Sequence, residues 1–447
     1  MTKLRRELTL YGLTMVAVGS SIGSGIFLTP SQIAGHLPSP ALIMLVWAVG
    51  GVIALTGALT FAELGSMFPQ AGGVYVYLRE AYGDLFGFLY GWAYLLVITS
   101  GAMAALAIAF AYYLGFIFPM SQTAITAVAL MVIVVVTTVN VVRVKAGGML
   151  ANIFTGLKLL GIGGLVIVGL VWGSPQTMRV VEPAAASSST GFVAAFGLAL
   201  VGVLWSYGGF QHASYVAGEA IDAKRTVPRA MILGALIVAF VYLLTNLAYL
   251  FLLPVPEIAA SGSVAADAVS TVIPFGGTLI ALVIAISVFG TAGIFALSTP
   301  RIYYAMAEDG IFFRKLADVH PRFRTPANAI LLQSGWAIVL LLFWGTFEDV
   351  ITYVVFMDWV FFGLAGAAVF VLRRTRRDAE RPYRTFGYPV TPGIFVGISI
   401  WFVINTLIER PLHAWVGLIF TLVGVGVYYV FKRRSRMAAP PRTGADR

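Results

Sequence analysis

Two short runs of glycine and serine interrupt apolar segments of this 447-residue sequence. Residues 19–25 lie within VGSSIGSGIF, and residues 206–209 lie within LWSYGGFQ. Where a helix breaks, its second half presents unpaired N–H groups and a positive dipole end, which favour a carboxylate. The first half ends in unpaired carbonyls, which accept hydrogen bonds from an ammonium. Together, the two breaks suit the α-carboxyl and α-amino groups of an amino acid.

Two charged side chains also lie deep within apolar segments. Lys158 lies about ten residues into its segment, and Asp358 lies within VFMDWVF. A charge at that depth is costly, so each residue is a functional candidate. Snorkelling of Lys158 to an interface is the alternative, although its side chain would reach only part of the way. Asp358 is either a titrating group or an acid held by a polar neighbour, and the sequence does not choose between these.

The elements that carry these residues are predicted to span a membrane. The chain is 59% hydrophobic and 11% charged, which indicates a polytopic membrane protein. The apolar windows are long, rich in Leu and Ala, and lack strand-like alternation, so we expect twelve helices and an all-α fold. The windows are 9–34, 40–68, 85–118, 122–142, 149–172, 192–220, 229–253, 276–305, 327–346, 349–372, 389–409 and 412–432.

The breaks fall in segments 1 and 6, five segments apart. Interruptions at corresponding positions of two halves indicate an inverted-repeat transporter with a site near the midplane. Irregular backbone is tolerated there only if it is buried in protein or lines a cavity. The alternative is that these glycines serve only close helix packing.

Composition also excludes several classes. The sequence has no cysteine, and its four histidines show no metal-site spacing, so we expect neither a metal nor a cofactor. An enzyme would need clustered acids or a paired histidine base, which are absent. The net charge of +10 reflects basic residues on one side of the segments, which places both termini in the cytoplasm. The charge is thus a topology signal, and we expect no nucleic-acid partner.

Several motifs resemble the amino acid–polyamine–organocation (APC) superfamily. They are GSGIF in segment 1, PQAGGVYVY at 69–77, FLYGW at 88–92, GEAIDAKRTVP at 218–228 and RIYYAMAEDG at 301–310. FTGLKLL at 154–160 is most similar to the L-type amino acid transporter (LAT) branch. The resemblance implies a LeuT-like fold with discontinuous helices 1 and 6. It would contain two inverted five-helix repeats, peripheral helices and a tail, at residues 1–172, 192–372, 389–432 and 433–447.

The resemblance also implies how the breaks bind substrate. The carboxylate would meet the amides of Ser24, Gly25 and Ile26. The ammonium would meet backbone carbonyls on both broken helices, those of Ser21, Ile22, Trp205 and Gly208. Trp205 occupies the position of the aromatic gate that closes over substrate in the family.

In this family, a lysine at the position of Lys158 lies against the first break and replaces a sodium ion. It would bond carbonyls near Gly19 and Ser20, with Ser298 or Thr291 as its partner on segment 8. If Lys158 titrates, transport is coupled to protons. If it stays charged, it is a fixed strut in an exchanger or facilitator.

Glu63 and Glu219 occupy places where the family has acids. Each is expected to bind basic residues of the cytoplasmic loops and form a gate. A solvated carboxylate at a helix end is an equally good interpretation of either residue.

The walls of the site suggest its substrate. Residues 85–119 and 275–300 carry no charge, which favours neutral amino acids. Phe210 stands where L-type relatives commonly carry Trp, and Gln211 follows it. The smaller ring would leave room for medium or large apolar side chains.

We therefore expect a secondary transporter of neutral L-amino acids that works by alternating access, through exchange or proton symport. The alternatives are an amino acid receptor without transport and, less favoured, a membrane-embedded enzyme. Animal L-type members use a cysteine after segment 3 to bond an ancillary glycoprotein, but the sequence here is FPMSQ at 118–122. A disulfide-linked heavy chain is thus excluded. We expect a stand-alone, multi-pass carrier in the lipid bilayer of a prokaryotic inner membrane.

Overall fold

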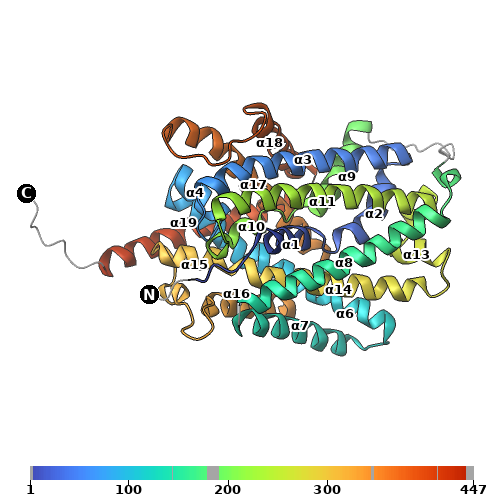
Figure 1. The fold of residues 1–447 in the computed structure, drawn as a ribbon, viewed down its shortest axis with the longest axis horizontal. Coiled ribbons are helices and arrows are strands. Elements are labelled where there is room, and N and C mark those ends of the chain that lie inside the picture. The colour runs from blue at the N-terminus through green and yellow to red at the C-terminus, as the bar shows by residue number, and fades with distance from the viewer. Residues whose placement is uncertain (1–3, 143, 179–190, 344–346, 410, 439–447) are drawn as a thin grey trace, which may run out of the picture.

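The computed structural model describes residues 4–142, 144–178, 191–343, 347–409 and 411–438, and its regular elements there are helices (Figure 1). The first half contains α1 Leu10–Ser21, α2 Gly25–His36, α3 Pro40–Met67, α4 Val74–Tyr82, α5 Asp84–Ala93, η1 Tyr94–Ile98, α6 Thr99–Ile117, α7 Gln122–Val142, α8 Val144–Trp172 and η2 Pro175–Met178. The second half contains α9 Phe192–Tyr207, α10 His212–Tyr215, η3 Ala217–Glu219, α11 Ala223–Leu252, α12 Val255–Ala260, α13 Val264–Ser270, α14 Gly276–Ser298, α15 Pro300–Glu308, η4 Arg314–Ala317, α16 Ala327–Phe343, α17 Phe347–Thr375, α18 Val390–Glu409 and α19 Pro411–Ala438.

Ten helical stretches in the described part of the chain are long and apolar enough to cross a membrane, and each overlaps a different one of the twelve expected windows. The other two windows, 327–346 and 412–432, hold the shorter helix α16 and the last helix α19. Helix α19 continues to Ala438, so residues 433–438 are helical, whereas the prediction placed them in a tail. The rest of that tail, residues 439–447, lies outside the described residues.

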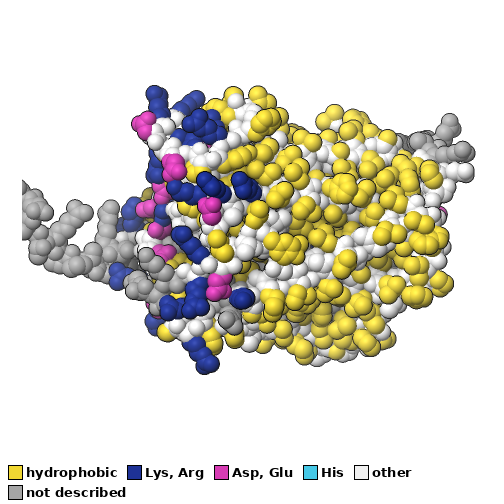
Figure 2. All heavy atoms as spheres, in the orientation of Figure 1, with side chains coloured by type: hydrophobic (Ala, Val, Ile, Leu, Met, Phe, Trp, Pro, Cys, Tyr) yellow, Lys and Arg dark blue, Asp and Glu magenta, His cyan; other side chains and the backbone are white. Residues whose placement is uncertain are grey.

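The helices run along one bundle axis, with α1 near the centre (Figure 1). Helix α11 packs against α1, α3 and α8, and α14 packs against α1, α6 and α8. Apolar side chains cover the middle of the bundle in Figure 2, and some project almost fully outward, such as Leu160 at 74% exposure. An outward apolar belt of this kind suits contact with lipid chains.

Lys and Arg side chains gather at one end of the bundle, where α4 and α15 lie (Figures 1 and 2). We call this the basic end. Exposed members of this group include Lys224, Arg225, Arg376 and Arg377. The one-sided distribution matches the asymmetry expected from the sequence.

Both predicted breaks are present. Helix α1 ends at Ser21 and α2 begins at Gly25, while α9 ends at Tyr207 and α10 begins at His212. Gly209 lies in the second break with φ of +132°, which favours glycine. A Cβ atom on Gly209 would lie 2.5 Å from the Ser21 amide nitrogen, so this glycine also allows the two breaks to meet.

A third irregularity was not predicted. Residues Tyr94–Ile98 form a π-helical turn, η1, between α5 and α6. The hydroxyl of Thr99 donates to the Tyr94 carbonyl at 2.7 Å, and that of Ser100 donates to the Leu95 carbonyl at 2.6 Å. These hydroxyls satisfy carbonyls in a turn whose hydrogen-bond register is shifted. The apolar pattern of this segment continues through residues 94–98, so the sequence does not indicate the π-helical turn.

Candidate functional site

The two breaks line one cavity of about 900 Å³, counted with its open mouth. Its remaining walls come from η1, α6, α14 and α17. The residues singled out from the sequence that line it are Ser20, Ser21, Ser24, Gly25, Trp205, Gly208, Gln211, Thr291 and Asp358. Those that do not line it are Gly19, Ile22, Ile26, Glu63, Lys158, Phe210, Glu219 and Ser298.

The first turn of α2 has free backbone donors, and Ser24 and Gly25 line this cavity. The amides of Ser24, Gly25 and Ile26 have no acceptor among the described residues, and Ser24 does not cap the helix with its side chain. Gly25 lies so close to Ser206 that a Cβ atom would be 2.6 Å from the serine Oγ. The start of α2 thus combines unpaired N–H groups with the positive end of the helix dipole.

The carbonyls expected to accept from an ammonium are mostly engaged within the protein. The Ser21 carbonyl accepts from the Tyr242 hydroxyl at 2.9 Å, and the Ile22 carbonyl accepts from Lys158 Nζ at 2.5 Å. The Trp205 carbonyl accepts from the Gly208 amide at 3.2 Å. The Gly208 carbonyl is the one predicted acceptor with no donor among the described residues. The donors to Ser21 and Ile22 come from α11 and α8, and spacing along one helix does not reveal such contacts.

Tyr242 of α11 was missed in the sequence. Its hydroxyl oxygen lies 2.9 Å from the carbonyl oxygens of both Ser21 and Ser206, so its one proton is shared between the two breaks. A second link runs from Ser20 Oγ to the Gly209 carbonyl at 2.8 Å. The Gln211 Oε1 atom accepts from the Gly209 amide at 3.0 Å. A tyrosine within an apolar helix gives no sign in sequence that its hydroxyl reaches two other helices.

Lys158 of α8 lies behind the first break and is fully buried. Its Nζ atom donates to the carbonyls of Gly19 at 2.9 Å and Ile22 at 2.5 Å, and to Thr291 Oγ1 at 2.8 Å. These three bonds match the number of N–H groups on an ammonium, and the burial excludes snorkelling to an interface.

Two partners expected for Lys158 make other contacts. Ser20 donates to the Gly209 carbonyl through its hydroxyl, and the second carbonyl that Lys158 binds is that of Ile22. Ser298 lies two helical turns from Thr291 along α14, where its Oγ atom pairs with His212 Nδ1 at 2.7 Å. The reach of a lysine side chain therefore selects Thr291 over Ser298.

Phe210 is a correction to the expected site. It is 3% exposed and packs on Phe61 of α3, with ring centroids 5.7 Å apart, outside the cavity lining. The left-handed backbone at Gly209 precedes it and changes the direction of the chain at this point. Aromatic walls come instead from Tyr94, Trp205, Phe295, Trp359 and Phe362, and of these only Trp205 was expected.

Asp358 of α17 lines the cavity beside three tyrosines. Its Oδ1 atom is buried and has no hydrogen-bond partner in the described part of the chain. Tyr90, Tyr94 and Tyr215 are close enough to interact electrostatically with its carboxylate. The Tyr215 hydroxyl donates to that of Tyr94 at 3.1 Å and lies 2.6 Å from that of Tyr90.

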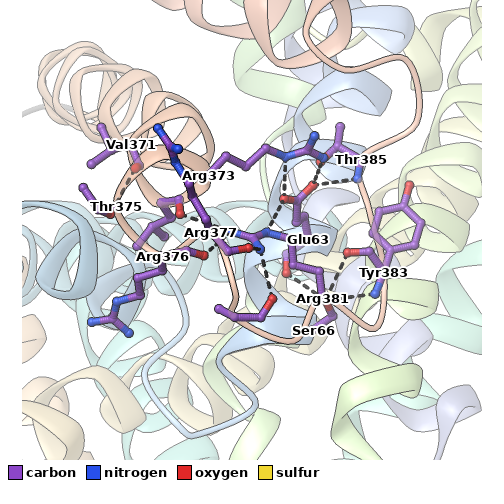
Figure 3. Close-up of polar contacts among 12 residues, drawn as sticks. Glu63, Ser66, Val371, Arg373, Thr375, Arg376, Arg377, Arg381, Tyr383 and Thr385 are labelled. Carbon is purple, nitrogen blue, oxygen red and sulfur yellow. Dashed lines mark hydrogen bonds and ion pairs between the residues drawn. The ribbon is translucent and has the colours of Figure 1, made fainter.

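Glu63 lies at the basic end, where the loop between α17 and α18 folds over α3 (Figure 3). Its carboxylate accepts from Arg373 through Nε at 2.9 Å and Nη2 at 2.7 Å, and from the Thr385 amide at 2.7 Å. Arg381 Nε lies 3.5 Å from the same carboxylate. At 1% exposure, Glu63 is not a solvated helix-end acid, but a buried anchor for this loop.

Glu219 of η3 makes a second buried pair at this end. Arg301 donates to it through Nε at 3.0 Å and Nη2 at 3.3 Å, and neither side chain is exposed. The Glu219 carbonyl also accepts from the amides of Glu7 and Leu8, and the Leu8 carbonyl accepts from Ile221. These backbone hydrogen bonds hold the segment before α1 against η3, next to the ion pair and close to the second break.

A more exposed network lies beside these pairs. Arg79 pairs with Glu80 at 2.6 Å and contacts Asp309, and Arg376 also contacts Glu80. Burial raises the pKa of Glu80, but the hydrogen bonds from the two arginines outweigh it and hold that pKa below its ordinary value. The basic end is therefore joined by several acid–arginine contacts from α4 and from the residues that follow α15 and α17 directly.

Sequence comparisons add to this geometry. The profile of the amino acid permease family matches residues 8–428. The serine/threonine exchanger SteT of Bacillus subtilis is 31% identical over 437 residues, which cover 96% of this chain and 98% of SteT. The b(0,+)-type amino acid transporter 1 of Homo sapiens is 30% identical, with 96% and 88% of the two chains covered. The Asc-type amino acid transporter 1 of Mus musculus is 29% identical, with 96% and 81% covered.

Proposed function

The chain belongs to the amino acid permease family, and from that premise we propose that it is a secondary transporter of neutral L-amino acids. One observation carries the proposal. The uncapped start of α2 faces a cavity between two broken helices, and the cavity has only one charged side chain among its described lining residues. Its relatives carry the names of transporters and exchangers, which supports a carrier over an enzyme.

The backbone of the breaks supplies recognition of the α-amino acid group. The substrate carboxylate binds the free amides of Ser24, Gly25 and Ile26, where donors and dipole act together. Its ammonium binds the free Gly208 carbonyl. Trp205, which lines the cavity on the last turn of α9, closes over the bound substrate. These contacts are made to the α-amino and α-carboxyl groups of the substrate, which all α-amino acids share. The cavity walls therefore decide which substrate side chain is accepted.

Neutral side chains are favoured because most of the walls are apolar or aromatic. Residues 85–119 and 275–300 contribute no charge, and Ile98, Ala102, Ala105 and Leu106 form part of the lining. Packing an apolar substrate side chain against these residues gives a favourable free energy of burial and leaves no polar group without a hydrogen-bond partner.

Lys158 serves as the link between substrate binding and movement of the first break. Its three hydrogen bonds tie the carbonyls of Gly19 and Ile22 to Thr291 of α14. If it keeps its proton, the carrier exchanges one amino acid for another, and if it releases the proton during the cycle, the carrier is a proton symporter.

We place the basic end in the cytoplasm of a cell with an inner membrane, with both termini on that side. Residues 1–172 and 192–372 form two inverted repeats, and α18 and α19 are peripheral. The absence of cysteine supports a stand-alone carrier. In this arrangement, the Glu63–Arg373 and Glu219–Arg301 ion pairs close the cytoplasmic side of the carrier. Alternating access requires these ion pairs to break.

Reconstitution into liposomes tests the proposal. We expect purified protein to take up labelled leucine or threonine. Uptake that requires an internal amino acid indicates exchange, and uptake that follows a pH gradient indicates symport. Binding without uptake under any of these conditions would identify a receptor instead. Neither binding nor uptake of any neutral amino acid would overturn the proposal.

A further inference from the structure

Asp358 is the only charged side chain among the described residues that line the cavity. Lys158 lies behind the break, and its three hydrogen bonds are made to protein atoms. The remaining titratable side chains of the lining are Tyr94 and His212, and His212 pairs with Ser298. The cavity therefore has a carboxylate without a cation to match it.

Hydrogen bonds within the protein leave part of this carboxylate unsatisfied. Tyr94 accepts from Tyr215, so its own hydroxyl proton is available for Asp358. Tyr215 and Tyr90 are joined to each other. The Oδ1 atom still has no partner among the described residues. A buried carboxylate oxygen without a donor is costly, and no described residue supplies one to Oδ1.

A cation brought by the ligand would satisfy this oxygen. In a poorly hydrated cavity, an anion favours an ammonium or guanidinium strongly, because solvent screens their attraction little. Trp359 and Phe362 flank Asp358 in the lining, and aromatic faces also attract cations. The start of α2, which offers donors to an α-carboxylate, lines the same cavity. One ligand that carries both groups is an amino acid with a basic side chain.

We infer that Asp358 forms a side-chain subsite through which the carrier accepts amino acids with cationic side chains, in addition to neutral ones. The inference rests on the proposed function, because it assumes that the start of α2 binds the α-carboxylate of a transported amino acid. A basic substrate would bring one positive charge to a cavity that has one negative charge. A neutral substrate would use the other walls and leave the subsite unfilled.

Competition experiments in proteoliposomes test this inference. Labelled leucine uptake is measured against unlabelled lysine, arginine and leucine, and uptake of labelled lysine is measured directly. In the wild type, we expect lysine to compete and to enter. In Asp358→Asn, the lysine concentration for half inhibition should rise at least about tenfold, as expected for loss of a buried charge partner. The unlabelled leucine concentration for half inhibition should change by less than about twofold.

Two further variants serve as controls. Asp358→Glu keeps the charge and should retain competition by lysine. Asp267→Asn makes the same chemical change at an exposed position of α13 and should behave like the wild type. If Asp358→Asn shows no uptake, thermal stabilisation of the detergent-solubilised protein by each amino acid replaces the assay. Stabilisation by leucine without stabilisation by lysine would then support the inference, and any other pattern would overturn it.

Several results contradict the inference. Lysine that neither competes nor enters in the wild type would overturn it while leaving transport of leucine intact. Equal lysine competition in the wild type and Asp358→Asn, or an equal loss for lysine and leucine, would also overturn it. A variant that loses only its response to a pH gradient would show that Asp358 carries a proton. Absence of leucine uptake in the wild type would instead count against the proposed function.

Discussion

Lys158 is a buried charge that fixes the backbone of the first break, although it does not line the cavity. Its ammonium has no carboxylate partner in the described contacts, and its donors are satisfied by two carbonyls and a hydroxyl. Those carbonyls belong to residues at the point where α1 unwinds, so they are not satisfied by a continuing helix. The break and the lysine therefore stabilise each other.

Replacing Lys158 with Ala is expected to reduce amino acid uptake at least about tenfold. The Gly19 and Ile22 carbonyls would lose their charged donor and keep only the hydroxyls of Thr291 and Ser287 within reach. Loss of a buried hydrogen bond from a charged donor costs about 1–3 kcal/mol. Initial rates in proteoliposomes, with and without a pH gradient, measure the effect. Lys224→Ala, at an exposed position, is the control. Full uptake by Lys158→Ala would mean that the break keeps its shape without the ammonium.

Tyr242 holds the two breaks together through its hydroxyl, while its ring packs on Trp47 and Tyr207. Tyr242→Phe retains the ring and removes only the donor. We expect a loss of about 1–2 kcal/mol in substrate binding, which is about five- to thirtyfold in apparent affinity. Concentration-dependent uptake measures it, with Tyr429→Phe at an exposed site as the control. An unchanged apparent affinity would show that Ser20 and Gly209 suffice to join the breaks.

At the scale of elements, the site depends on helices that stop at defined residues. The break in α1–α2 and the break in α9–α10 meet closely because Gly209 has no side chain. Figure 1 shows α1 and α10 near the centre of the bundle, and residues 19–25 of the first break are buried. A membrane protein can leave backbone groups unpaired beside a cavity only where other helices separate them from lipid. Here α3, α11 and α14 provide that separation.

Gly209→Ala should therefore abolish uptake or prevent stable folding. Alanine at φ of +132° is strained, and its Cβ atom would overlap the Ser21 backbone. Yield of monodisperse protein and uptake by any folded fraction are the measurements. Gly163→Ala places a methyl group in a helix where no atom lies within 4 Å, so it should be tolerated. A stable and active Gly209→Ala protein would contradict the close approach of the breaks.

At the scale of the whole molecule, the basic end is closed by contacts from distant parts of the sequence. The Glu219–Arg301 pair joins η3 to α15, and residues 7–8 cross beneath it. The Glu63 pairs hold the loop after α17 against α3 (Figure 3). A buried ion pair is sensitive to loss of one partner, because the remaining charge is left without compensation.

Opening of this end can be measured with introduced cysteines, because the sequence has none of its own. Ala217→Cys, at a position that is 1% exposed, should react slowly with a membrane-impermeant thiol reagent applied from the basic end. Adding Glu219→Gln should raise that rate at least about tenfold, because loss of the ionic contact favours an open end. Asp378→Cys, which is exposed, sets the maximum rate. Equal rates for Ala217→Cys in both backgrounds would show that other contacts keep this end closed.

The sequence by itself determined the membrane class, the helical architecture, both breaks and the candidates Lys158 and Asp358. These features follow from local properties: apolar length, glycine and serine within a span, and the cost of a charge in lipid. Tertiary structure decided which groups are free. Tyr242 and Lys158 occupy carbonyls expected for substrate, Thr291 is chosen over Ser298, and Phe210 packs on Phe61 away from the cavity. These outcomes depend on the direction and reach of side chains from other helices, and spacing along one helix does not specify them.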